Sequence, residues 1–337
     1  MKDNFTININ KELILRIKEY LKYAKIDSTL KTDHWAKRTS NNLDSIKINN
    51  ESITIFKNDT GLSDEYEALF DKNYVKKINA KKLIKNKIIN NLKIKCRDNY
   101  DPIYYYKKNL PPTPFITLDN VHAEFGKKHQ DFTIYKAAFF LNEIMNSINS
   151  YDFNKKNIIE IGPGTGNLIR LIKSKYTKTN FCIVDIKSSI IFSILNLLYR
   201  FQNSTFILPN ELSNIDKTLI FKKNFEFVFL NNDQLNYLPN KFFNFGINTM
   251  SFQEMHYKQI KDYFNLLRKI LVLDNFFYCV NAVEKPMIVN NVNQSIRFHE
   301  YPWSAKDTDI SFKLSTVEEI RTTKPFFSKL TKLHIND

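Results

Sequence analysis

The chain has 337 residues, of which 43% are hydrophobic and 25% are charged, and its formal net charge is +15. This balance is ordinary for a soluble globular chain of one large domain or two medium ones. Its three cysteines, Cys96, Cys182 and Cys279, have no paired spacing, which argues against a disulfide framework and against a zinc site.

The sequence contains no candidate for a membrane span. Its longest apolar run, "IIFSILNLL", is about half of the length that a span needs. The first ten residues, "MKDNFTININ", lack the apolar region of a signal peptide, so we expect a cytoplasmic protein.

The positive charge raises the question of a nucleic-acid partner. Lysine far outnumbers arginine and is spread along the chain, which a compositional bias of the gene explains as well as binding does. The densest run, "KKINAKKLIKNK", is typical of a solvated helix face. We therefore do not expect nucleic acid as the partner.

The first part of the chain has helical patterns. Residues 9–25 place Leu13, Ile14, Ile17, Tyr20 and Leu21 on one helical face. Residues 64–98 have a second, lysine-rich helical pattern, and the breaker "NLPPTPF" at 109–115 precedes a buried helix over 135–148. We therefore expect residues 1–130 to form a mainly helical segment that serves as a lid, an acceptor-binding region or a dimerisation surface. The pair His34 and Trp35 lies within this segment. If the segment is a dimerisation surface, the protein forms a homo-oligomer.

Short apolar strands alternate with helices from residue 131 to residue 337. The pattern predicts strands over 157–161, 180–186, 225–231, 243–250 and 275–281, with helices over 166–175, 188–201 and 257–271. Strands linked by helices need right-handed crossovers, which make a parallel sheet that is buried on both faces. We therefore predict a doubly wound α/β domain over residues 131–337.

Glycine is concentrated at a single point of this domain. The chain has only 6 glycines, and Gly162, Gly164 and Gly166 lie together in "EIGPGTG", directly after the first strand. Glycines there allow positive φ angles and a close approach of a ligand to the backbone. In a dinucleotide fingerprint the third glycine would fall at Asn167. A carboxylate at the strand end, Glu160, also suits a cationic ligand better than a phosphate.

This stretch resembles motif I of class I S-adenosylmethionine-dependent methyltransferases. The resemblance implies a Rossmann-like, mostly parallel seven-stranded sheet and S-adenosylmethionine as the cofactor. An acid at the end of the next strand, Asp185, would bind the ribose hydroxyls. In that family a polar group after the following strand faces the adenine. The expected cofactor-binding residues are Glu160, Gly162, Gly164, Gly166, Asp185, Asn232, Asp233 and Asn248.

The acceptor is indicated by the stretch "NTMSFQEMH", after the fourth strand. The (Asp/Asn)-Pro-Pro-Tyr-like motif of amino-directed nucleic-acid methyltransferases is missing there, as is a Pro-Cys nucleophile. Together with Tyr301-Pro302-Trp303, residues Ser251 to Met255 resemble the sugar O-methyltransferases of bacterial polysaccharide clusters. The resemblance implies transfer to a hydroxyl of a sugar, nucleotide sugar or glycan. An RNA methyltransferase and a catalytically silent S-adenosylmethionine-binding module remain alternatives.

A sugar hydroxyl must lose its proton as it attacks, so a general base is needed. His256 is the first candidate, Glu254 the second, as base or as orienter of the base, and His299 the third. Tyr301 and Trp303 either stack on a sugar or close the core. No cluster of residues has metal-ligand spacing, and the loop acids Asp307 and Asp309 alone are weak grounds for a metal ion, so we expect none.

Overall fold

The computed structural model describes residues 4–8, 10–26, 43–44, 46–49, 52–56, 113–126, 132–149, 151–221, 225–289, 292–315 and 325–335. The helix predicted over 64–98, the pair His34 and Trp35, and Cys96 lie outside these described residues.

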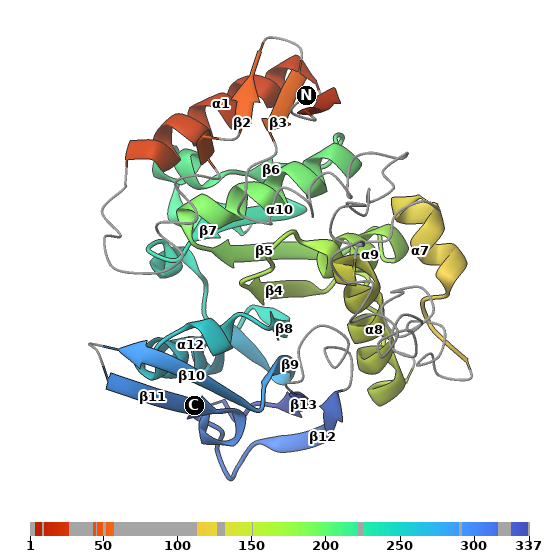
Figure 1. The fold of residues 1–337 in the computed structure, drawn as a ribbon, viewed down its shortest axis with the longest axis vertical. Coiled ribbons are helices and arrows are strands. Elements are labelled where there is room, and N and C mark those ends of the chain that lie inside the picture. The colour runs from red at the N-terminus through yellow and green to blue at the C-terminus, as the bar shows by residue number, and fades with distance from the viewer. Residues whose placement is uncertain are drawn as a thin grey trace, which may run out of the picture.

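The main sheet has eight strands among the described residues, in the order β12-β13-β9-β8-β4-β5-β7-β6 (Figure 1). They are β4 (Asn157–Ile161), β5 (Asn180–Asp185), β6 (Phe206–Ile207), β7 (Phe227–Asn231), β8 (Phe243–Thr249), β9 (Leu271–Ala282), β12 (Thr308–Ser315) and β13 (Phe326–Lys332). Neighbouring strands pair in parallel along the series β9-β8-β4-β5-β7-β6. In contrast, β13 pairs antiparallel with both β9 and β12. The sheet is therefore large and mostly parallel.

Helices cover both faces of this sheet. One face packs against α1 (Lys11–Ile26), α8 (Phe132–Ser147), α9 (Asn167–Lys175) and α10 (Lys187–Arg200), and the other against α12 (Tyr257–Ile270) and the short α11 (Lys217–Ile220). The helix α7 (Leu118–Phe125) begins with a capping box between Thr117 and Asn120 and packs beside α8. The two apolar clusters on the two faces confirm the predicted doubly wound arrangement.

The strand count differs from the expected seven. The extra strand is β6, which pairs with β7 at the edge of the sheet through only Phe206 and Ile207. At the opposite edge, β12 and β13 alternate polar and apolar residues, and part of this edge is exposed. Such short or half-exposed strands carry a weak periodicity signal, which is why the sequence pattern missed them.

The N-terminal segment contains strands as well as a helix. The predicted helix over 9–25 is present as α1, and the five apolar residues expected on one of its faces are all buried. The strands β1 (Asn4–Asn8), β2 (Ile46–Ile48) and β3 (Ser52–Phe56) form a separate antiparallel sheet in the order β1-β3-β2. The sequence pattern did not indicate these short strands, because asparagine, threonine and serine dilute their alternation.

The strand order changes direction at β4. The next strands in the chain, β5, β6 and β7, all lie on one side of β4, whereas β8 and β9 lie on its other side. In open parallel sheets, ligands bind outside the carboxyl ends of the strands at such a switch point. Gly162 immediately follows β4, so the glycine-rich turn lies at this place in the fold.

Candidate functional site

The three glycines of the turn after β4 all have positive φ angles, of 68° at Gly162, 60° at Gly164 and 75° at Gly166. A β-carbon on Gly162 would collide with the side chain of Ser251, in the loop after β8. A β-carbon on Gly164 would meet no described atom within 4 Å. Gly162 therefore allows the two loops to touch, whereas Gly164 leaves open space beside the backbone for a ligand.

Glu160 is buried at the end of β4, with 1% of its surface exposed. Its Oε1 accepts a long hydrogen bond of 3.5 Å from Thr249, and its Oε2 has no partner among the described residues. Burial raises the pKa of Glu160 to about 8, the bond from Thr249 lowers it, and Asp185 raises it. An unpaired buried carboxylate oxygen is costly, so this side chain is suited to a cationic ligand.

Asp185 ends β5, the neighbouring strand, and accepts a hydrogen bond of 2.8 Å from the Ile186 amide. Its pKa is raised to about 7, mainly by burial and also by the charge of Glu254. The hydrogen bonds from the Ile186 and Gly164 amides act in the opposite direction and lower the pKa. The carboxylates of Glu160, Asp185 and Glu254 thus act on one another at the same end of the sheet. Among the described residues, no lysine or arginine contributes to the pKa shifts of Glu160 and Asp185.

The end of β7 is held by α1. Asn231 pairs in register with Asp185, and its Nδ2 donates to the Tyr23 hydroxyl at 3.2 Å. The amide of Asn232 donates to the backbone carbonyl of Asp185 at 3.0 Å. Asp233 is about half exposed and forms an ion pair of 3.2 Å with Lys187. Asn232 therefore lies directly beside Asp185, and Asp233 follows it in the chain; their expected contact with the adenine stays a prediction.

Asn248, which the sequence places among the cofactor-binding residues, is engaged in a network of hydrogen bonds. It is fully buried at the end of β8, where its Nδ2 donates to the Ile161 carbonyl and to Ser251. Its Oδ1 accepts from Asn281 and from the Phe252 amide. Every donor and acceptor of this amide is occupied, so Asn248 positions the loop after β8 against the glycine turn.

The three candidates for the general base lie in different surroundings. Glu254 is exposed, ends the short helix η4 (Phe252–Glu254), and lies close enough to Asp185 to raise its pKa. His256 is half-buried and begins α12, where its amide donates to Gln259 at 3.0 Å. His299 is exposed on η5 (Phe298–Glu300), where it acts on Glu284 of the neighbouring hairpin. No described interaction joins His299 to the acids at the strand ends.

The aromatic motif near the C-terminus belongs to the core. Tyr301 is buried and packs against Phe252 and Phe264, while the Trp303 indole nitrogen donates to the Phe298 carbonyl at 3.0 Å. Of the two interpretations that the sequence left open, these contacts support core closure. Cys182 and Cys279 are also buried, as free thiols.

Asp307 and Asp309 do not form a metal site. Asp307 pairs with Arg268 at 2.6 Å, and Asp309 pairs with Lys329 at 2.9 Å. Within the described ranges, no group of three or more histidines, cysteines or acids could hold a metal ion. No helix of those ranges is long and apolar enough to cross a membrane.

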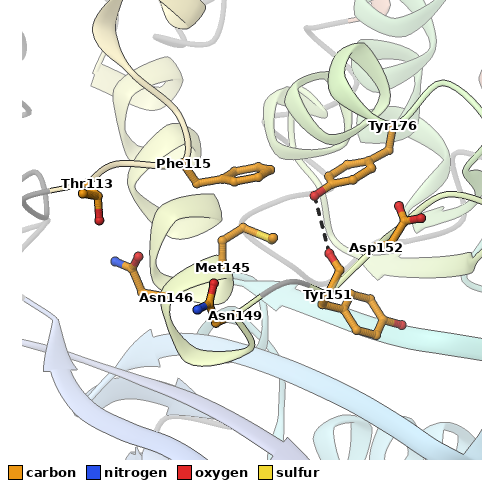
Figure 2. A pocket seen from close by; sticks show the side chains of 8 residues that line it. All are labelled: Thr113, Phe115, Met145, Asn146, Asn149, Tyr151, Asp152 and Tyr176. Carbon is orange, nitrogen blue, oxygen red and sulfur yellow. Dashed lines mark hydrogen bonds between the residues drawn. The ribbon is translucent and has the colours of Figure 1, made fainter.

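A cavity of about 510 Å³ lies near the amino end of β4, and Figure 2 shows the side chains that line it. Tyr151 and Asp152, just before β4, line it together with Tyr176, just after α9. Phe115 stacks on Tyr176, with ring centroids 6.0 Å apart. The cavity contains none of the glycine-turn residues, so it is separate from the candidate site.

Sequence reasoning missed three tyrosines and one asparagine at this site. Burial raises the pKa of Tyr20 and Tyr263, and Asp185 contributes to both shifts, so α1 and α12 bring a phenol near this acid from two sides. Tyr23 and Asn231 meet at the end of β7. The only available signal was that Asn231 ends a predicted strand, because contacts between α1 and β7 depend on the tertiary fold.

Comparisons with known proteins give structural likeness alone. No protein-family model matches the chain, and no curated protein matches its sequence. A SAM-dependent methyltransferase from Leishmania major is 12% identical, with a TM-score of 0.37, over 69% of this chain and 83% of that one. The glycopeptide N-methyltransferase MtfA is 10% identical, with a TM-score of 0.37, over 60% of this chain and 90% of that one. An arsenic(III) S-adenosylmethionine methyltransferase from Chlamydomonas reinhardtii is 10% identical, with a TM-score of 0.31, over 54% and 64% of the two chains.

Proposed function

We propose that this protein is an S-adenosylmethionine-dependent methyltransferase that transfers the methyl group to a sugar hydroxyl in the biosynthesis of a surface polysaccharide or other glycan. The observation that carries the proposal is the set of carboxylates beside the glycine-rich turn. Asp185 raises the pKa of Glu160, Glu254 raises the pKa of Asp185, and Glu160 Oε2 has no partner among the described residues. A bound cation would favour the ionised form of these acids, whereas the negative charge of a pyrophosphate would disfavour it.

The residues present fit the chemical groups of this cofactor. Glu160 would bind the ammonium of the methionine end, and Asp185 would accept from the ribose hydroxyls. Asn232 and Asp233 would lie toward the adenine, and the open space at Gly164 leaves room for the nucleoside. S-adenosylmethionine supplies a methyl group on a sulfonium, which is already a good leaving group.

The loop after β8 favours a hydroxyl acceptor. Phe252 is fully buried against Tyr263 and Phe264, so it offers no exposed ring on which a nucleobase could stack. Glu254 exposes its carboxylate on the same loop, near Asp185. A carboxylate beside the acceptor can orient a hydroxyl and remove its proton, which is the assistance that an alcohol needs.

We propose a new order for the candidate bases. Glu254 becomes the first choice, because it is electrostatically close to the cofactor acid Asp185. His256 follows two residues later, at the start of α12, and becomes the second choice. The protein then acts mainly by holding the acceptor oxygen in line with the methyl group, while Glu254 accepts the proton.

Incubation with methyl-tritiated S-adenosylmethionine tests this function directly. We expect label in a pool of nucleotide sugars or bacterial glycans and not in total RNA. Glu254→Gln should lower kcat by about 10²–10⁴-fold, the usual contribution of a general base, with little change in the Kd for S-adenosylhomocysteine. Full activity of Glu254→Gln together with loss of activity in His256→Ala would return the role to His256.

Two other outcomes would replace the proposal. Methyl transfer to RNA, with an affinity that falls steeply as salt rises, would identify an RNA methyltransferase. Cofactor binding with no transfer to any sugar or RNA pool would identify a silent binding module. Neighbouring genes for glycosyltransferases would support the sugar acceptor.

A further inference from the structure

Helix α10 places two polar side chains against the glycine-rich turn. The Ser193 hydroxyl donates to the Gly164 carbonyl at 3.0 Å, and Asn196 Nδ2 donates to the Thr165 carbonyl at 2.7 Å. Their spacing places Ser193 and Asn196 on one face of the helix, and both are fully buried. The other buried residues of α10 are apolar. Burying a polar group is costly unless it is hydrogen-bonded, so these two side chains indicate that α10 supports the turn.

The contact between the helix and the turn is close. A β-carbon on Gly166 would lie 3.4 Å from side-chain atoms of Ser193 and Leu197. A trans peptide directs its carbonyl and its amide N–H in opposite directions. The bonds from Ser193 and Asn196 therefore direct the amides of the next residues, Thr165 and Gly166, away from α10.

The same turn also contacts the acid at the end of β5. The Gly164 amide donates to the Asp185 carboxylate, which lowers the pKa of that acid. The helix α10 begins at Lys187, shortly after Asp185. One helix thus connects both parts of the candidate site, because it follows the acid in the chain and binds the turn through Ser193 and Asn196.

The orientation of the Asn196 amide is fixed by Arg170 of α9. Arg170 Nη1 donates to Asn196 Oδ1 at 2.7 Å, and a guanidinium only donates, so Asn196 must turn its Nδ2 toward Thr165. Arg170 is buried, and it donates to the carboxylate and to the backbone carbonyl of Glu124 on α7, both at 2.7 Å. Glu124 therefore holds Arg170, which in turn orients Asn196.

The glycines of the turn explain why such support matters. Gly162, Gly164 and Gly166 give the backbone more conformational freedom than other residues would, and a flexible loop loses this freedom when a ligand binds. Hydrogen bonds to two carbonyls of the turn restrict its conformation in advance, which favours tighter binding.

We propose that Ser193 and Asn196 are positioning residues, which hold the glycine-rich turn in the conformation that binds the cofactor. This inference rests on the proposed cofactor and is independent of the acceptor. Ser193 acts through Gly164 and Asn196 acts through Thr165, so neither side chain needs to touch the ligand.

Ser193→Ala is the mildest test, because it removes a single hydroxyl from the helix. The Kd for S-adenosylhomocysteine, measured by isothermal titration, should rise about three- to tenfold, the usual contribution of one hydrogen bond. In the ligand-free protein, amide hydrogen exchange over residues 164–167 should become faster. Asn196→Asp, which keeps an acceptor for Arg170 and loses the donor to Thr165, should also raise the Kd.

A carbon NMR titration of the Asp185 carboxyl group in the ligand-free protein separates positioning from a general loss of stability. Ser193→Ala should loosen the Gly164 amide from Asp185 and so raise the pKa of this acid above about 7. The variant changes none of the titratable groups among the described residues that interact with Asp185, which are Glu160, Glu254, Tyr20 and Tyr263.

Ser147→Ala is the matched control, because the Ser147 hydroxyl donates to the Glu143 carbonyl within α8 at 2.8 Å. This variant loses the same kind of bond away from the turn, so the Kd, the exchange over 164–167 and the pKa of Asp185 should not change. If Ser193→Ala gives the same three results as Ser147→Ala, the positioning role is wrong while the proposed cofactor stands. If the unaltered protein does not bind S-adenosylhomocysteine, the proposed cofactor fails and this inference fails with it.

Discussion

Glu160 is the residue that most clearly departs from what folding alone would favour. A carboxylate with 1% exposure and an unpaired oxygen destabilises the ligand-free protein, and a buried apolar residue would not carry that cost. Burial raises its pKa to about 8, so near neutral pH the ligand-free protein holds a proton there. A bound cation favours the ionised form, which couples ligand binding to proton release.

This shift predicts a specific dependence of stability on pH. The pKa of Glu160 rises from 4.5 in the unfolded chain to about 8 in the fold, so the folded state binds the extra proton between these values. The free energy of unfolding should therefore fall as pH rises through this window, by up to about 1.4 kcal/mol per pH unit. Glu160→Gln should reduce this slope by the share of Glu160, as measured by urea unfolding of the ligand-free protein.

Glu160 should contribute the larger share of the slope above pH 7, because the pKa of Asp185 is raised only to about 7. Below pH 7 both acids contribute to the slope. Equal slopes for Glu160→Gln and the unaltered protein above pH 7 would show that Glu160 does not hold the proton.

The two glycines of the turn should respond differently to alanine. Gly162→Ala adds a methyl group that collides with Ser251, at a φ angle of 68°, and should destabilise the fold by about 2–4 kcal/mol. Gly164→Ala meets open space at a φ of 60° and should cost only about 1–2 kcal/mol of backbone strain. Thermal unfolding measures the difference.

For the affinity for S-adenosylhomocysteine we expect the opposite order, with the larger loss in Gly164→Ala, the more stable of the two variants. Gly164→Ala places a methyl group where the nucleoside would lie, so its Kd should rise at least about tenfold despite a stable fold. An unchanged Kd would show that the open space at Gly164 is not part of the binding site.

At the scale of elements, a half-buried cluster around Arg16 attaches α1 to the sheet edge. The Arg16 guanidinium donates two bonds of 2.6 Å to Glu211 and one of 2.9 Å to the Phe206 carbonyl, and it lies 3.8 Å from the centroid of the Phe206 ring. This contact holds the helix that carries Tyr23 against the end of β7, at the top of Figure 1. Bidentate arginine–carboxylate pairs are the strong form of this interaction.

Arg16→Met should therefore loosen α1. We expect a loss of about 1–3 kcal/mol in stability, since Glu211 is left without its charged partner, and faster hydrogen exchange over residues 11–26. Lys22→Met is the matched control, because the Lys22–Glu19 pair is exposed at 70% and 61%. Equal exchange in both variants would show that the Arg16–Glu211 pair does not hold the helix.

The sequence predicted the elements whose periodicity is strong. The strand–helix alternation from β4 to β9 is confirmed, because fully buried strands and amphipathic helices leave clear patterns. Glu160 and Asp185 could be placed because each ends such a strand. Asn231 and Tyr23 could not be joined, because 208 positions separate them and only the packing of α1 brings them together.

Over the whole molecule, the candidate functional groups lie on the side of the sheet where the parallel strands have their carboxyl ends. The glycine turn, Asp185 and Glu254 all lie at the carboxyl ends of strands or in the loops directly after them, and α1 approaches the same side. Among the described residues, the groups that act on Glu160 and Asp185 are acids and hydrogen-bond donors, and Lys187 pairs with Asp233 close by.

Calorimetric titration of the unaltered protein with S-adenosylhomocysteine, and separately with NAD, tests the central claim most directly. The carboxylates at the ends of β4 and β5 predict binding of S-adenosylhomocysteine, no measurable binding of NAD, and loss of the first signal in Asp185→Ala. Tight binding of NAD with no signal from S-adenosylhomocysteine would contradict the account, because a pyrophosphate would then occupy the turn beside Glu160.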